Sequence, residues 1–228
     1  MDLQEHYNSM YDNAVRRFKE GACEPDAWID AAGDSRMGLT LRLRPDRQVV
    51  NRIQHFLDAA RGLEPNQYFY GEENIHVTVL SIISCYPGFS VSDIVVADYV
   101  KEIKESLAGI GTFNLTFRGI TASPSCIMVQ GFMEEDGLEM LRQRLRENIA
   151  KSGLQQSMDQ RYTLQTAHAT VLRLKQKMEN RDGLLQLLDK YRNNDWGRSS
   201  VTEVELVLND WYHQPDRTSV LKRIPLLE

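Results

Sequence analysis

Cysteine is scarce in this sequence, and its placement excludes two kinds of small domain. The chain has three cysteines among 228 residues, at Cys23, Cys85 and Cys126. Their number is odd and none of them forms a Cys-x-x-Cys pair, which argues against both a disulfide framework and a zinc knuckle. We therefore expect reduced thiols.

Long hydrophobic runs are also missing. The longest apolar stretches, such as Val77 to Ile83, fall far short of the roughly 20 residues that span a bilayer, and the first residues are polar and charged instead of signal-like. The sequence predicts no membrane association and, by default, a cytoplasmic location. A hydrophobic content of 42% over 228 residues is nevertheless enough for a substantial core in one large or two small lobes.

The chain has no excess of positive charge. Its 27 Lys and Arg residues are outnumbered by 32 Asp and Glu residues, which gives a net charge of −5 and a pI near 5.6. Non-specific binding to nucleic acid depends on clustered basic residues that displace counterions, so long duplexes are not expected ligands. A small phosphate-bearing ligand in a local basic pocket remains compatible with this balance.

One five-residue string, His-x-Thr-Val-Leu, occurs twice in this sequence. It begins at His76 and again at His168, in two short apolar, β-branched runs typical of strands. Side chains along a strand alternate between its faces, so each histidine shares a face with the threonine two residues later, Thr78 or Thr170. Two such strands lying side by side would place two imidazoles and two hydroxyls around one small volume.

This set of side chains suits chemistry at a phosphate. An imidazole takes or gives a proton near neutral pH, so one histidine can serve as base and the other as acid. The threonine hydroxyls can donate hydrogen bonds to phosphate oxygens as negative charge builds up there. No metal is required for this reaction. A single histidine on a strand is usually structural, but the duplication of the string favours a catalytic pair.

Strands and helices alternate throughout the chain. The N-terminal segment carries Leu3, Tyr7, Tyr11, Ala14 and Phe18 at helical spacing and predicts an amphipathic helix. Further helices are expected over about 46–61, 92–108, 137–151 and 180–192, and strands over 37–44, around each histidine string, and over 112–122, 126–133, 204–209 and 219–224. This pattern predicts two halves rich in β-α-β units, each with one copy of the string.

The chain resembles the 2H phosphoesterase superfamily, which includes the bacterial 2′-5′ RNA ligases and cyclic nucleotide phosphodiesterases. The resemblance rests on His76, Thr78, His168 and Thr170, on the order of the surrounding elements, and on the closing Val-Leu-Lys-Arg-Ile-Pro-Leu stretch. It extends over residues 37–228, and residues 1–36 form an N-terminal helical extension outside it. The resemblance implies a bilobal α+β fold in which two antiparallel-rich sheets face a central groove, with both motifs on its floor.

The resemblance also implies roles for individual residues. His76 and His168 would be acid and base, Thr78 and Thr170 would donate to phosphate oxygens, and no cofactor or metal would be needed. Arg173 matches a basic position that follows the second motif in many ligase-like members. Strict alternation places Arg173 on the face opposite His168, so a role at the phosphate requires a twist or the end of the strand at that point.

Four other residues are candidate substrate contacts. Tyr70 and Tyr212 lie in aromatic clusters that could stack on a nucleotide base, although such clusters more often belong to the core. Arg42 and Arg44 lie on the face of the first strand opposite its leucines and could bring positive charge to a phosphodiester. A solvated strand face is the alternative for this pair.

These features lead to one main functional hypothesis and three alternatives. The main one is a metal-independent phosphoesterase that hydrolyses, or reversibly forms, a 2′,3′-cyclic phosphate or 2′-5′ phosphodiester in a nucleotide or short RNA. The second is a binding module for an RNA end or phosphorylated nucleotide with little catalysis. The sequence leaves open the physiological substrate, the assignment of base and acid, and the oligomeric state.

Two hydrolase classes have weaker support. A metal hydrolase could use His76, His168, His213 and Glu72 or Glu73, but the sequence lacks a His-x-His or His-Glu-x-x-His spacing. A Ser-His-Asp hydrolase would need a Gly-x-Ser-x-Gly elbow, which is also missing.

Overall fold

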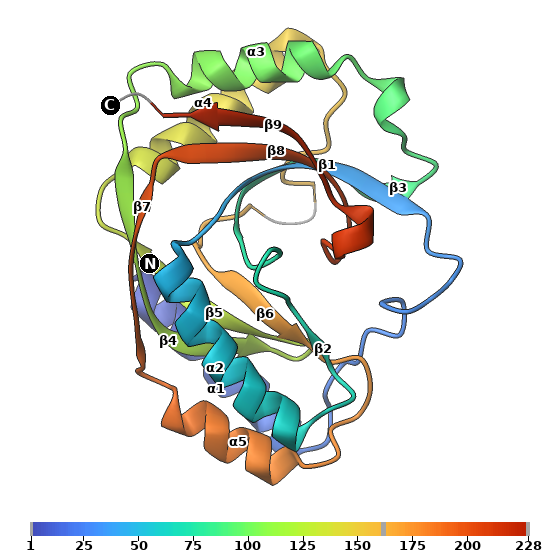
Figure 1. Ribbon diagram of the computed structural model, residues 1–228, viewed down its shortest axis with the longest axis vertical. Helices are drawn as coiled ribbons and strands as arrows, with labels where there is room; N and C mark the ends of the chain where they lie inside the picture. Colours follow the sequence, from blue (N-terminus) through green and yellow to red (C-terminus); the bar gives the residue numbers. More distant parts are fainter. Residues whose placement is uncertain (1, 161–162, 227–228) are drawn as a thin grey trace.

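The computed structural model describes residues 2–160 and 163–226 and shows a single curved antiparallel sheet with helices on its outside (Figure 1). The strands are β1 (Arg36–Leu43), β2 (Tyr68–Phe69), β3 (Val77–Pro87), β4 (Phe113–Ser123), β5 (Cys126–Met133), β6 (Ala169–Arg173), β7 (Asp195–Val201), β8 (Glu203–Asp210) and β9 (Ser219–Pro225). Their order is β7-β4-β5-β6-β3-β1-β8-β9, with β2 paired to β6. The predicted α+β class is confirmed.

The helices divide between the two ends of the sheet. They are α1 (Leu3–Lys19), α2 (Arg47–Leu63), α3 (Val96–Leu107), α4 (Gly137–Ser152) and α5 (Arg181–Lys190), with short 3-10 turns η1 (Val91–Asp93) and η2 (Pro215–Arg217). Helices α1 and α2 lie over β4, β6 and β7, and α5 packs against these two helices. Helices α3 and α4 lie over β9 and β3 (Figure 1). Two lobes result, each with one histidine motif.

Two expectations about the lobes need correction. The two predicted sheets are one sheet, because β3 and β6 pair at Val77 and Ala169 and so join the lobes. The lobes are also not consecutive halves of the chain. The first-motif lobe takes β8 and β9 from the C-terminal end of the chain. Helix α2 comes from the first half of the chain but covers the second-motif lobe, and α4 comes from the second half but covers the first-motif lobe. Local patterns cannot show such exchanges, since strand partners are chosen by packing over long sequence distances.

The N-terminal helix forms as predicted. Asp2 caps it by accepting a hydrogen bond from the Gln4 amide, and the spacing of its apolar residues buries one face against β4. The Tyr7 hydroxyl donates to the Gly131 carbonyl over 3.1 Å, and Thr121 donates to the Tyr7 carbonyl over 2.9 Å. The helix is therefore tied to the lobe that contains the second motif.

Strand β7 was not expected from the sequence. Its residues, Asp-Trp-Gly-Arg-Ser-Ser-Val, include few β-branched side chains and lack a clear alternation of apolar and polar positions. Tertiary contacts stabilise it instead, because Trp196 is fully buried and its indole donates to the Gly119 carbonyl over 3.0 Å. Among the described residues, no helix is both long and apolar enough to cross a membrane.

Candidate active site

Both histidine motifs line one pocket at the junction of the two lobes. The pocket has an interior volume of about 170 Å³. From the predicted site it contains His76, Thr78, His168, Thr170, Arg173 and Tyr70, and further lining comes from residues that include Asn209, Trp211 and His213.

Strand pairing explains why the two motifs share this pocket. Val77 and Ala169, the middle residues of the two His-x-Thr strings, are direct partners in the β3–β6 pair. Both are fully buried, and their side chains point away from the pocket. Because strands alternate faces, the residues before and after each of them point into it. Antiparallel pairing about this point sets each histidine beside the threonine of the other motif.

His76 is held in one orientation and one tautomer. Its Nδ1–H donates to the Asn74 carbonyl over 2.6 Å, so in the neutral ring Nε2 keeps a free lone pair. The side chain is buried, and burial lowers the pKa of His76 to about 3, with the nearby Arg42 guanidinium adding to the effect.

His168 has a less restrictive partner. Its Nδ1 lies 2.6 Å from the Thr166 hydroxyl, which can donate or accept, so either tautomer is possible. Burial lowers the pKa of His168 to about 4, and the cationic Arg142 and Arg173 act in the same direction. Both imidazoles are thus neutral in the free protein at pH 7. An anion in the pocket would favour protonation.

Arg173 reaches the pocket because of a bulge in β6. Met128 pairs with Thr170 and Ile127 with Leu172, so Val171 is an extra residue in β6. One extra residue reverses the alternation, which brings Arg173 to the face of His168 and Thr170. The Arg173 Nε then donates to the Tyr70 hydroxyl over 3.0 Å. This local irregularity is the kind of feature that the sequence analysis required for Arg173.

Three of the candidate substrate contacts lie outside the pocket. Arg42 is 3% exposed and forms a buried ion pair with Glu205, its Nη2 lying 2.9 Å from the carboxylate. Arg44 donates to the Glu72 and Glu73 carbonyls. Neither guanidinium lines the pocket.

Tyr212 is the third candidate contact that lies outside the pocket. It is fully buried outside the pocket, and its hydroxyl donates to Asp26 over 2.9 Å. Its ring is therefore closed to a base. Tyr70 does line the pocket, but it is 2% exposed and serves as the partner of Arg173, so it offers no open ring face.

His213 is a pocket residue that the sequence analysis considered only as a metal ligand and as part of an aromatic cluster. Its ring centroid lies 4.0 Å from that of His76, and its backbone has a left-handed φ of 53°. Its Nδ1 is buried and has no hydrogen-bond partner among the described residues. Burial and the neighbouring His76 hold the pKa of His213 well below its usual range, so the ring is neutral.

Arg142 is a second residue that sequence reasoning missed. It is 2% exposed on α4 and donates to the carbonyls of Val79, Thr78 and Thr166 over 2.9, 2.7 and 2.8 Å. The first two belong to the first-motif strand and the third precedes the second motif. Its position in the sequence could have indicated a buried role, because Arg142 lies four residues after Leu138 and therefore on the apolar face of the predicted helix.

The carboxylates of the alternative metal site lie apart from its three histidines. Glu72 and Glu73 are exposed and lie outside the pocket. In the parts of the chain that the structure describes, no group of three or more His, Cys, Asp and Glu side chains is close enough together to hold a metal ion.

Solved structures share this architecture. TT0787 of Thermus thermophilus matches with a TM-score of 0.62 at 14% identity, over 83% of this chain and 97% of its own. E. coli LigT complexed with 3′-AMP matches with a TM-score of 0.54 at 20% identity, over 85% of this chain and 99% of its own. A structure described as a phosphoesterase matches with a TM-score of 0.53 at 20% identity, over 85% and 99%.

The chain has the fold of E. coli LigT. These structural matches show the fold alone, because sequence identities of 14–20% say little about the roles of individual residues. No protein-family model and no curated protein sequence matches this chain. Within the LigT-like fold, the curled antiparallel sheet is what brings the two motif strands together.

Proposed function

We propose that this chain is a metal-independent 2H phosphoesterase that opens a 2′,3′-cyclic phosphate or cleaves a 2′-5′ phosphodiester in a nucleotide or short RNA. The observation that carries the proposal is the convergence of both His-x-Thr motifs on one pocket. A nucleotide ligand is supported by the LigT structures, one of which contains 3′-AMP and another NADP+.

The reaction needs two proton transfers. For a cyclic phosphate, one imidazole removes a proton from water as its oxygen bonds to phosphorus. The second imidazole protonates the ribose oxygen as its bond to phosphorus breaks, so that water is added across the ester. Thr78 and Thr170 donate to the non-bridging oxygens, and Arg173 supplies the positive charge. The same groups run the reverse reaction.

The hydrogen bonds of the two rings favour one assignment. The Asn74 carbonyl holds a proton on Nδ1 of His76, which leaves Nε2 ready to accept the proton of the attacking oxygen. We therefore assign His76 as the base and His168 as the acid. Thr166, the partner of His168, can accept from Nδ1–H when that ring is protonated.

Product analysis tests the proposal. The protein is incubated in excess EDTA with 2′,3′-cyclic mononucleotides, 2′-5′ and 3′-5′ dinucleotides and cyclic oligonucleotides, and products are separated chromatographically. Conversion that survives EDTA and disappears in His76→Ala supports metal-free phosphoesterase chemistry. Activity lost with the chelator would contradict it, and no conversion across the panel would favour the binding role.

A further inference from the structure

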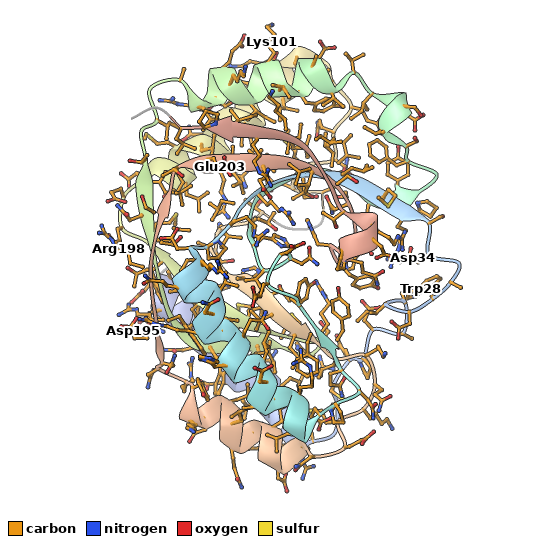
Figure 2. The ribbon with its side chains drawn as sticks, in the orientation of Figure 1. Trp28, Asp34, Lys101, Asp195, Arg198 and Glu203 are labelled. Atoms are coloured by element: carbon orange, nitrogen blue, oxygen red, sulfur yellow. The ribbon has the colours of Figure 1, made fainter. Side chains whose placement is uncertain are left out.

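An exposed tryptophan lies beside the pocket, in the segment that connects α1 to β1. Trp28 is 59% exposed. Figure 2 shows it at the edge of the molecule together with Asp34. The Arg36 guanidinium lies 5.5 Å from the centroid of the Trp28 ring and 5.9 Å from that of Trp211. Because Trp211 lines the pocket, Trp28 and the pocket are linked through a single guanidinium.

The segment around Trp28 is fixed to residues that directly follow Arg173 and His213 of the pocket lining. The Asp26 amide donates to the carbonyl of Leu174, one residue beyond the end of β6, over 2.8 Å. Gln214 donates to the Ile29 carbonyl over 2.7 Å, and the Trp28 amide donates to the Asp26 carboxylate over 3.1 Å. The tryptophan is thus held on a backbone that is anchored on both sides of its position.

Arg36 is itself oriented by two contacts. Its Nε donates to Asp34 over 2.8 Å and its Nη2 donates to the Tyr212 hydroxyl over 3.2 Å. A fixed guanidinium against an aromatic ring stabilises the ring's position through a cation–π contact. Most of the Trp28 surface nevertheless stays in water, which is unusual for so large an apolar side chain held in place.

We propose that Trp28 is a stacking platform for a nucleobase adjacent to the reacting phosphate, so that the preferred substrate is a single-stranded RNA end longer than one nucleotide. The inference rests on the proposed function, because it assumes that a nucleotide phosphate occupies the pocket. Flat aromatic rings beside a phosphate site bind successive bases with little dependence on sequence. The segment lies in residues 1–36, outside the region of family resemblance, so it adds a subsite to the LigT-like core.

Kinetics with two substrates test the platform. Trp28→Ala is compared with the parent on a 2′,3′-cyclic mononucleotide and on a short oligoribonucleotide with the same cyclic phosphate end. We expect kcat/KM for the oligonucleotide to fall about 5- to 150-fold, the range for alanine substitution of a base-stacking aromatic, with the mononucleotide unchanged. Trp28→Phe should keep part of the preference. Met140→Ala, at a 40% exposed apolar residue on α4, is the matched control.

Several outcomes would overturn the platform. Equal effects of Trp28→Ala on both substrates, or no effect on either, would contradict it. So would a dimer in the parent that becomes a monomer in Trp28→Ala by sedimentation, because Trp28 would then cover a protein interface.

The proposed function can fail separately, if the parent turns over neither substrate. Binding of a 3′-phosphorylated oligoribonucleotide, followed by fluorescence anisotropy, then decides the platform by itself. Weaker binding to Trp28→Ala than to the parent supports it, and equal binding refutes it.

Discussion

At the scale of single residues, the proposal assigns proton transfer to two imidazoles and charge stabilisation to two hydroxyls. Replacing His76 or His168 by alanine should lower kcat about 10²- to 10⁴-fold with a much smaller change in substrate affinity. Thr78→Val and Thr170→Val should each cost about 2–4 kcal/mol of transition-state stabilisation. Steady-state kinetics on the converted substrate give these values. A histidine variant with the parent's turnover would refute the mechanism.

The assignment of base and acid makes a separate prediction. A phosphodiester with an aryl leaving group needs no proton on the departing oxygen, so His168→Ala should lose little activity on it. His76→Ala should lose as much activity on the aryl ester as on the ribose ester, because water must still be deprotonated. The ratio of the two rates in each variant measures this. The opposite pattern would exchange the roles.

The low pKa values of the two histidines predict an unusual pH profile. The pH dependence of kcat/KM reports protonation of the free enzyme. The reaction needs one histidine neutral, as the base, and the other protonated, as the acid. With pKa values of about 3 for His76 and about 4 for His168, the free enzyme in this protonation state becomes rarer as the pH rises. We expect kcat/KM to fall about tenfold per unit between about pH 5 and pH 8. A bell centred near pH 6.5 would instead indicate two unperturbed imidazoles.

At the scale of elements, Arg142 ties β3 and the segment before β6 to α4. Lysine cannot reproduce its fork of donors, so Arg142→Lys should leave buried carbonyls unpaired at about 1–3 kcal/mol each. We expect a loss of about 2–3 kcal/mol in the free energy of unfolding, and a lower kcat because the motifs lose their alignment. Denaturant unfolding and kinetics on the folded variant measure both. Arg144→Lys, on the exposed side of the same helix, is the control.

Elements were predictable where one local pattern decided them. The apolar spacing around Leu138, Leu141 and Leu145 predicted α4, and the run from Cys126 to Met133 predicted β5 with the observed bounds. Strand β7 has no such pattern, because its stability comes from Trp196 in the core and from pairing with β4. The joining of two sheets into one depends on the Val77–Ala169 pair, which no local signal reports.

At the scale of the whole molecule, the two motif histidines link stability to pH. Their pKa values are lower in the folded state than the ordinary value near 6.5, so the unfolded chain binds more protons below that pH. The stability that the two neutral rings contribute is present above about pH 6.5. It is lost as the pH falls toward the pKa of His168, about 4, and that of His76, about 3. Each histidine should cost up to about 1.4 kcal/mol of unfolding free energy per pH unit in that window.

Denaturant unfolding at a series of pH values measures this effect. The double variant His76→Gln with His168→Gln should lose less stability between about pH 6.5 and pH 4.5 than the parent. His55→Gln, at an exposed position on α2, is the control and should follow the parent curve. Parallel curves for parent and double variant would show that the two histidines do not cause the acid sensitivity.

The sequence by itself determined the identity of the paired motifs and the face that each presents, because alternation along a strand is a local property. Tertiary structure alone decided the surroundings of these residues. Arg173 turns inward through a bulge defined against β5, and Arg42 forms an ion pair with Glu205, which lies 163 positions away in the chain. His213 comes to lie on His76 through the turn after β8. Such contacts depend on which distant segments pack together, and the spacing of residues along one chain does not encode that directly.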